Sequence, residues 1–181
     1  MELLSFTHPF PHVIAAGVLS SNAEASALSI LRTLQWQERT TGFYRVNVAA
    51  SAEQLANLTG LPALVAMLQE MKPLLETQLQ INLGNDATMV AQLYDGNSII
   101  GFHTDHAEGG ARLVLNLNEN WQISDGGIWI LASRPAADQA LFLPPLSNTA
   151  FAFQTSARSF HALTRRSVGN SYALIVHYPV A

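Results

Sequence analysis

The chain of 181 residues contains no cysteine, and charged residues make up only 12% of it. The lack of thiols excludes disulfides and thiolate metal sites, so any metal must be held by His, Asp, Glu or backbone oxygen. No apolar run approaches the roughly 20 residues that span a bilayer, and the first residues lack the basic start of a signal peptide. The net charge of −4, without a Lys/Arg cluster, disfavours nucleic acid as a partner. We therefore expect a cytoplasmic protein without membrane or nucleic-acid partners.

The length and the hydrophobic content of 49% are typical of a single folded domain, residues 1–181. In residues 1–86 the pattern predicts strands over residues 13–19 and 43–48 and three supporting helices, which begin near residues 20, 51 and 62. Pro73 lies in the last of these, and we expect it to kink or split that helix.

From about residue 87 the helical spacing stops, and short β-type runs recur between turn signals. These runs cover residues 88–94, 98–102, 112–118, 127–131, 140–143, 149–153, 159–163 and 172–177. Eight short strands in about ninety residues are typical of a jelly roll or barrel. The sequence thus predicts a mainly β protein, a double-stranded β-helix (jelly roll) over residues 87–181, with the N-terminal helices packed on one of its sheets.

One short motif carries the chemistry of a metal site. His103 and Asp105 are two residues apart at the end of a predicted strand, so both side chains project from the same face. His161 lies on a later predicted strand and can supply a third ligand. Two imidazoles and one carboxylate on one face of an octahedron form the facial triad of non-haem Fe(II) oxygenases, which leaves three positions open.

The sequence from Tyr94 to Tyr178 also resembles a known family. The matching pieces are the segments YDGN at 94–97, HTD at 103–105, RLVLNLNENW at 112–121, GGIW at 126–129, FAF at 151–153, SFH at 159–161 and YALIVHY at 172–178. They resemble the prolyl 4-hydroxylase-like branch of the Fe(II)/2-oxoglutarate dioxygenases. The resemblance implies that His103, Asp105 and His161 bind Fe(II), with 2-oxoglutarate and O2 as cosubstrates and ascorbate as an auxiliary reductant.

The sequence departs from this family where the distal carboxylate of 2-oxoglutarate is held. The family has a basic residue about ten positions after the distal His, and here that position is Ser171. A tyrosine that contacts the same carboxylate in relatives is replaced by Asn116. A buried carboxylate needs a compensating partner. We expect Arg112 to replace the missing cation, with Tyr94, Asn116 and Ser171 as further cosubstrate contacts, and we expect Arg165 and Arg166 to be solvated loop residues.

Three histidine and arginine side chains are further candidates for the substrate pocket. These are His106, Arg158 and His177. The substrate class implied is an amino acid, a small metabolite or a peptidyl residue, oxidised at an unactivated C–H bond. Two alternatives stay open: a 2-oxoglutarate-independent Fe(II) oxidase whose substrate itself chelates the iron, favoured by Ser171, and a non-catalytic metal-binding barrel. The sequence does not indicate the oligomeric state.

Overall fold

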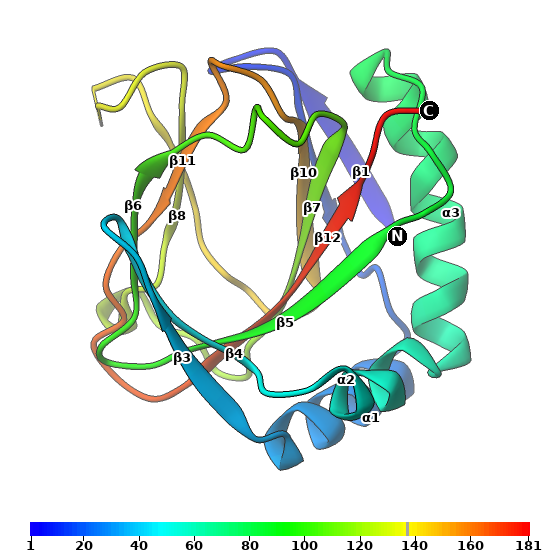
Figure 1. Ribbon diagram of the computed structural model, residues 1–181, viewed down its shortest axis with the longest axis vertical. Coiled ribbons are helices and arrows are strands. Elements are labelled where there is room, and N and C mark those ends of the chain that lie inside the picture. Colours follow the sequence, from blue (N-terminus) through cyan, green and yellow to red (C-terminus); the bar gives the residue numbers. More distant parts are fainter. Residues whose placement is uncertain (137) are drawn as a thin grey trace.

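The computed structural model describes residues 1–136 and 138–181, with the side chains of residues 52 and 54 excepted. Within this part of the chain, three α-helices accompany a sheet of twelve strands that curls into a barrel (Figure 1). The helices are α1 (Ser21–Thr33), α2 (Ala52–Thr59) and α3 (Pro62–Leu79). None of the helices found in these residues is long and apolar enough to cross a membrane.

The strands follow each other around the barrel in the order β1-β2-β10-β7-β12-β5-β4-β6-β11-β8-β9, with β3 paired to β4. Their bounds are β1 Glu2–Phe6, β2 His12–Ala16, β3 Trp36–Thr40, β4 Tyr44–Ala49, β5 Thr88–Tyr94, β6 Ile99–His103, β7 Ala111–Leu117, β8 Trp129–Ala132, β9 Leu141–Leu143, β10 Thr149–Gln154, β11 Phe160–Leu163 and β12 Ser171–Tyr178. The pairings within this order are antiparallel. The mainly β jelly roll expected from the sequence is confirmed.

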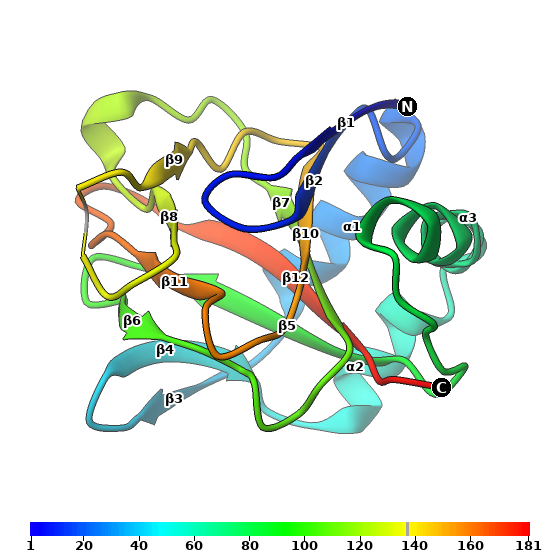
Figure 2. The same ribbon diagram turned by 90° about the horizontal axis from the view of Figure 1, so that it is seen from above.

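The helices cover the outer face of the sheet made by β2, β10, β7, β12 and β5 (Figures 1 and 2). Ser20 caps α1, since its side chain accepts a hydrogen bond from the backbone N–H of Ala23. One apolar side of each long helix shares a buried cluster with every second residue of the strands, and this cluster includes Leu31, Leu75, Leu113 and Leu174. Helical and strand periodicity thus meet in one core, as the sequence predicts.

The strand runs expected after residue 87 agree with β5 to β12 within two residues at each end. Two strands were not expected, β1 and β3, and both have mostly exposed residues without an apolar alternation. The expectation that Pro73 splits the third helix is wrong, because α3 runs without interruption from Pro62 to Leu79.

The alternate residues of the same strands face the inside of the barrel and form a second apolar cluster. It includes Phe151 and Phe153 from β10, Trp129 from β8 and Tyr94 from β5. The Trp129 ring packs edge-on against Tyr94 and Phe151, with ring centroids 5.8 and 5.4 Å apart. This cluster fills one part of the barrel and leaves space beside it for a site.

Candidate metal centre

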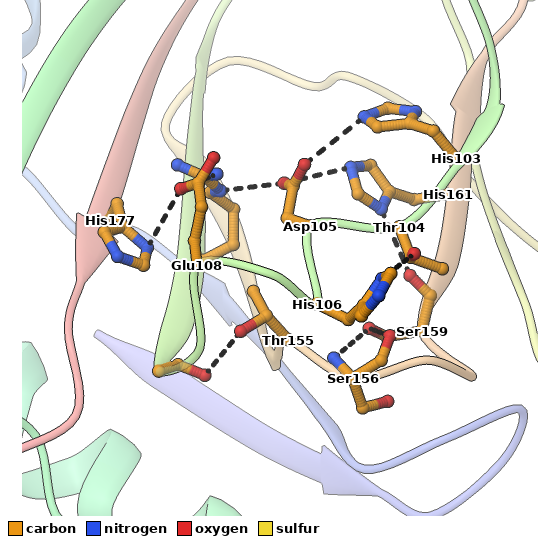
Figure 3. A network of polar contacts seen from close by, with 12 residues as sticks. His103, Thr104, Asp105, His106, Glu108, Thr155, Ser156, Ser159, His161 and His177 are labelled. Atoms are coloured by element: carbon orange, nitrogen blue, oxygen red, sulfur yellow. Dashed lines mark hydrogen bonds and ion pairs between the residues drawn. The ribbon is translucent and has the colours of Figure 1, made fainter.

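The structure brings His103, Asp105 and His161 together at one end of the barrel (Figure 3). His103 ends β6 and His161 lies on β11, and the two residues are direct neighbours in the antiparallel pairing of these strands. Asp105 follows β6 in the next loop. One ligand atom from each residue lies within 4.8 Å of the other two. A strand pair and its adjoining loop thus supply all three candidate ligands.

Both imidazoles present the same ring nitrogen to the centre. Nδ1 of His103 lies 3.0 Å from the carbonyl oxygen of Gly101, and Nδ1 of His161 lies 3.2 Å from that of Ser159. Each Nδ1 therefore carries the proton and donates it to a carbonyl, which leaves the Nε2 lone pair free for a metal. The two Nε2 atoms lie 3.7 and 3.6 Å from the oxygens of Asp105.

The electrostatics of the centre suit metal binding. Burial, and next the neighbouring His103, lower the pKa of His161 to about 4. His161 is therefore neutral near pH 7. Its Nε2 atom faces the Asp105 carboxylate with a lone pair, so this contact is not a salt bridge. Two imidazoles and one carboxylate within reach of one point form the donor set of a facial triad. The residues present fit a ferrous ion.

A chain of polar contacts supports Asp105 from another part of the barrel (Figure 3). Nε of Arg112, on β7, donates a hydrogen bond of 3.0 Å to Oδ2 of Asp105. Nη2 of Arg112 donates to Glu108 over 2.7 Å, and Nδ1 of His177 lies 3.7 Å from the same Glu108 oxygen. The charge of Arg112 is therefore already shared between two carboxylates.

A cavity of about 260 Å³ opens at the metal centre and runs into the barrel. The apolar part of its wall is formed by Val46, Val48, Val90, Ile100, Val114 and Ile175. Its polar lining, besides the triad, consists of Tyr44, Gln92, Glu108, Arg112 and Trp129. Among the described residues that line it, Arg112 is the only cation. Its volume falls just below the range of about 300–1,000 Å³ that is usual for drug-sized ligands.

The residues expected to contact the cosubstrate lie around this cavity in different ways. Arg112 lines it, whereas Tyr94, Asn116 and Ser171 are buried behind the lining. Tyr94 donates its hydroxyl to Oε1 of Gln92. The Asn116 amide is engaged at both ends, by the indole N–H of Trp129 at 3.2 Å and the carbonyl of Thr149 at 3.5 Å. Ser171 Oγ is buried without a hydrogen-bond partner among the described residues. Their role in cosubstrate binding stays a prediction.

The predicted substrate residues are not brought together. His106 is exposed and contacts Thr104 Oγ1 at 2.8 Å. Arg158 is exposed on the loop before β11. His177 is half-buried beside Glu108, and burial lowers its pKa. Their role in substrate binding also stays a prediction.

Two residues have positions that the sequence did not reveal. Arg166 is only 4% exposed, which corrects the expectation of a solvated side chain, and it lies against Gly127 and 3.8 Å from Asp125. The second residue is Gln92, on β5, which lines the cavity two residues before Tyr94. A strand glutamine carries no signal of its own in the sequence; only the inward alternation of β5 could have suggested it.

The fold places the chain among double-stranded β-helix proteins. No protein-family model matches the sequence, and no curated protein matches it either. Solved structures do. A prolyl-4-hydroxylase from Pseudomonas putida matches with a TM-score of 0.72 at 16% identity, over 94% of this chain and 92% of that one. A prolyl hydroxylase from Trichoplax adhaerens, solved in complex with a peptide fragment of hypoxia inducible factor, matches with a TM-score of 0.76 at 15% sequence identity. The match covers 93% of this chain and 83% of that one.

A third solved structure holds 2-oxoglutarate. It is the viral collagen prolyl hydroxylase of Paramecium Bursaria Chlorella virus-1 as a 2-oxoglutarate complex, with a TM-score of 0.67 at 12% identity over 94% of this chain and 96% of that one. The protein therefore has the fold of prolyl hydroxylases and other 2-oxoglutarate/Fe(II) oxygenases, which is the fold implied by its sequence motifs.

Proposed function

We propose that this protein is a non-haem Fe(II) oxygenase that uses 2-oxoglutarate and O2 to oxidise a C–H bond. The observation that carries the proposal is the convergence of the Nε2 atoms of His103 and His161 with the carboxylate of Asp105 within 4.8 Å. A ferrous ion held by these three residues would supply the oxidising chemistry with O2.

The protein's own residues hold and shield this centre. The Gly101 and Ser159 carbonyls fix the orientation of the two imidazoles, and Arg112 fixes Asp105. Such supporting hydrogen bonds set both the geometry and the basicity of metal ligands. The valine and isoleucine wall of the cavity keeps water from the reacting atoms, so that the oxidation is directed at the bound substrate.

The size of the cavity favours a small target. With about 260 Å³, it has room for a 2-oxo acid and the reacting end of a substrate. We infer a small molecule, such as an amino acid, or a single side chain of a peptide. The complex of the Trichoplax adhaerens relative with a peptide supports the second of these. A cytoplasmic location and a use of ascorbate stay predictions.

One observation favours a second candidate, an Fe(II) oxidase that needs no 2-oxoglutarate. Ser171 stands where the resembled family has its carboxylate-binding cation. Arg112 is the cation among the described residues that line the cavity, and it already pairs with Asp105 and Glu108. In this alternative the substrate itself chelates the iron.

An anaerobic titration of the Fe(II) protein with 2-oxoglutarate separates these candidates. We expect a saturable visible metal-to-ligand charge-transfer band that is absent in His161→Ala. If iron binds without giving the band, the oxidase is favoured. If the protein binds no iron, both candidates are rejected.

A further inference from the structure

Gln92 lies close to Ser171, the position where the resembled family has a cation and this chain has none. Ser171 is paired with Tyr94, and Ala173 is paired with Gln92, two residues further along the same two strands. Residues two apart on a strand face the same side, so Gln92 and Ser171 both face the inside of the barrel. Ala173, the partner of Gln92, has a small side chain, and Gln92 itself lines the cavity.

The orientation of the Gln92 amide follows from its neighbour. Burial raises the pKa of Tyr94 far above its ordinary value, so the hydroxyl keeps its proton. That proton needs an acceptor, and among the described residues the Tyr94 hydroxyl donates its hydrogen bond to Oε1 of Gln92. The Nε2 amide group of Gln92 therefore remains available as a donor, because it makes no hydrogen bond to any residue that the structure describes.

The other polar groups of this region are not available as donors to a ligand. The Asn116 amide is held by Trp129 and Thr149. Ser171 does not line the cavity, and Arg112 is shared between Asp105 and Glu108 beside the metal centre. Tyr44 lines the cavity too, but it belongs to β4, which is separated from the strand of Ser171 by β5, whereas Gln92 lies on β5 itself, directly beside that strand. Gln92 alone combines a place next to Ser171 with an unused donor in the described cavity wall.

We propose that the Gln92 amide holds the far end of the 2-oxo acid, in place of the cation that the chain lacks at residue 171. This inference rests on the proposed function, because it takes the 2-oxo acid to be chelated at the His103–Asp105–His161 centre. A neutral N–H donor binds any acceptor oxygen, whereas a cation strongly prefers a carboxylate. The site therefore accepts 2-oxo acids with a carboxylate or a neutral carbonyl at the far end, and Gln92 determines this breadth.

The test measures dissociation constants from the anaerobic charge-transfer band, with 2-oxoglutarate and with its 5-carboxamide as the two probes. For the wild-type protein we expect 2-oxoglutarate to bind at most about tenfold more tightly than its carboxamide, since an ionised acceptor only about doubles the strength of one hydrogen bond from a neutral donor. Gln92→Leu should weaken both probes by about tenfold or more, the loss of one hydrogen bond. Fe(II) affinity should not change, because Gln92 is not a ligand.

A second variant keeps the local fold. In Gln92→Glu the side chain has the same size and still accepts the Tyr94 hydroxyl, but it repels a carboxylate. We expect 2-oxoglutarate to weaken by about tenfold more than its carboxamide. Gln37→Glu is the matched control, since Gln37 is exposed on β3 and lines none of this cavity.

Each result decides between the two proposals. Bands that form normally in both Gln92 variants, or a wild-type preference for 2-oxoglutarate of a hundredfold, overturn the role of Gln92 and leave the proposed function standing. A wild-type protein that binds Fe(II) and gives no band with either probe overturns the use of a 2-oxo acid, and with it the role of Gln92.

Discussion

Arg112 donates a hydrogen bond of 3.0 Å from Nε to Oδ2 of Asp105, across the barrel from the strand pair that carries the two histidines. This contact joins two sides of the barrel at the candidate metal centre, because Arg112 belongs to β7 and Asp105 to the loop after β6. The carboxylate is thereby held in place before a metal binds.

Removing one member of the triad should remove metal binding. For His161→Ala and for Asp105→Ala we expect Fe(II) affinity to fall by at least about a hundredfold, since two ligands cannot form a facial triad. An anaerobic competition titration against a chelator measures this. His106→Ala is the matched control, because His106 is exposed in the same loop. Unchanged affinity in both triad variants would contradict the assignment.

The bond between Arg112 and Asp105 gives a second prediction. Arg112→Gln should lower Fe(II) affinity by about 10- to 100-fold, the usual effect of losing an outer hydrogen bond to a ligand. The exposed Arg158 supplies the control Arg158→Gln. If Fe(II) affinity stays constant and the dissociation constant of 2-oxoglutarate rises instead, Arg112 is a cosubstrate anchor, as the sequence predicts.

Gly110 fixes the start of β7, and so the place of Arg112. Its φ is +82°, and a Cβ atom there would lie 1.9 Å from the carbonyl oxygen of Tyr178. Gly17 has φ +63° but no atom within 4 Å of a Cβ. Gly17→Ala should therefore lower the free energy of unfolding by only about 1–2 kcal/mol, the cost of a left-handed backbone conformation for an L-residue. Gly110→Ala should lower it clearly more. Urea unfolding of both variants measures the difference, and equal losses would show that the close contact relaxes.

The stability of the metal-free protein should depend on His12. Burial lowers the pKa of His12 below its ordinary value of 6.5, and its Nε2 has no partner among the described residues. Below pH 6.5 the unfolded chain thus binds a proton that the folded protein does not take up, so the free energy of unfolding falls as the pH falls.

Urea unfolding at pH 7.5 and 5.5 tests this dependence. We expect the decrease to be smaller in His12→Phe than in the wild-type protein, whereas His106→Phe, at an exposed position, should leave it unchanged. A decrease in His12→Phe as large as in the wild-type protein would assign the pH dependence to other groups.

Most of the fold was readable from local patterns. The runs after residue 87 alternate because each strand has one face on the helices and one face inside the barrel, as Leu113 and Val114 illustrate. The edge strands β1 and β3 lack this alternation because neither is covered on both faces, so periodicity could not reveal them. Pro73 lies within a continuous helix, which the local rule did not predict.

By itself, the sequence determined the jelly roll and indicated His103, Asp105 and His161 as candidate metal ligands, because strand alternation, the spacing of His103 and Asp105 and the motifs of the resemblance can all be read along the chain. Only the tertiary structure decided which other side chains meet those ligands. Arg112, Glu108 and Gln92 come to the cavity from different strands and loops, and their partners are set by strand order and register. The burial of Arg166 likewise depends on a turn of the chain about forty residues earlier, at Asp125 and Gly127.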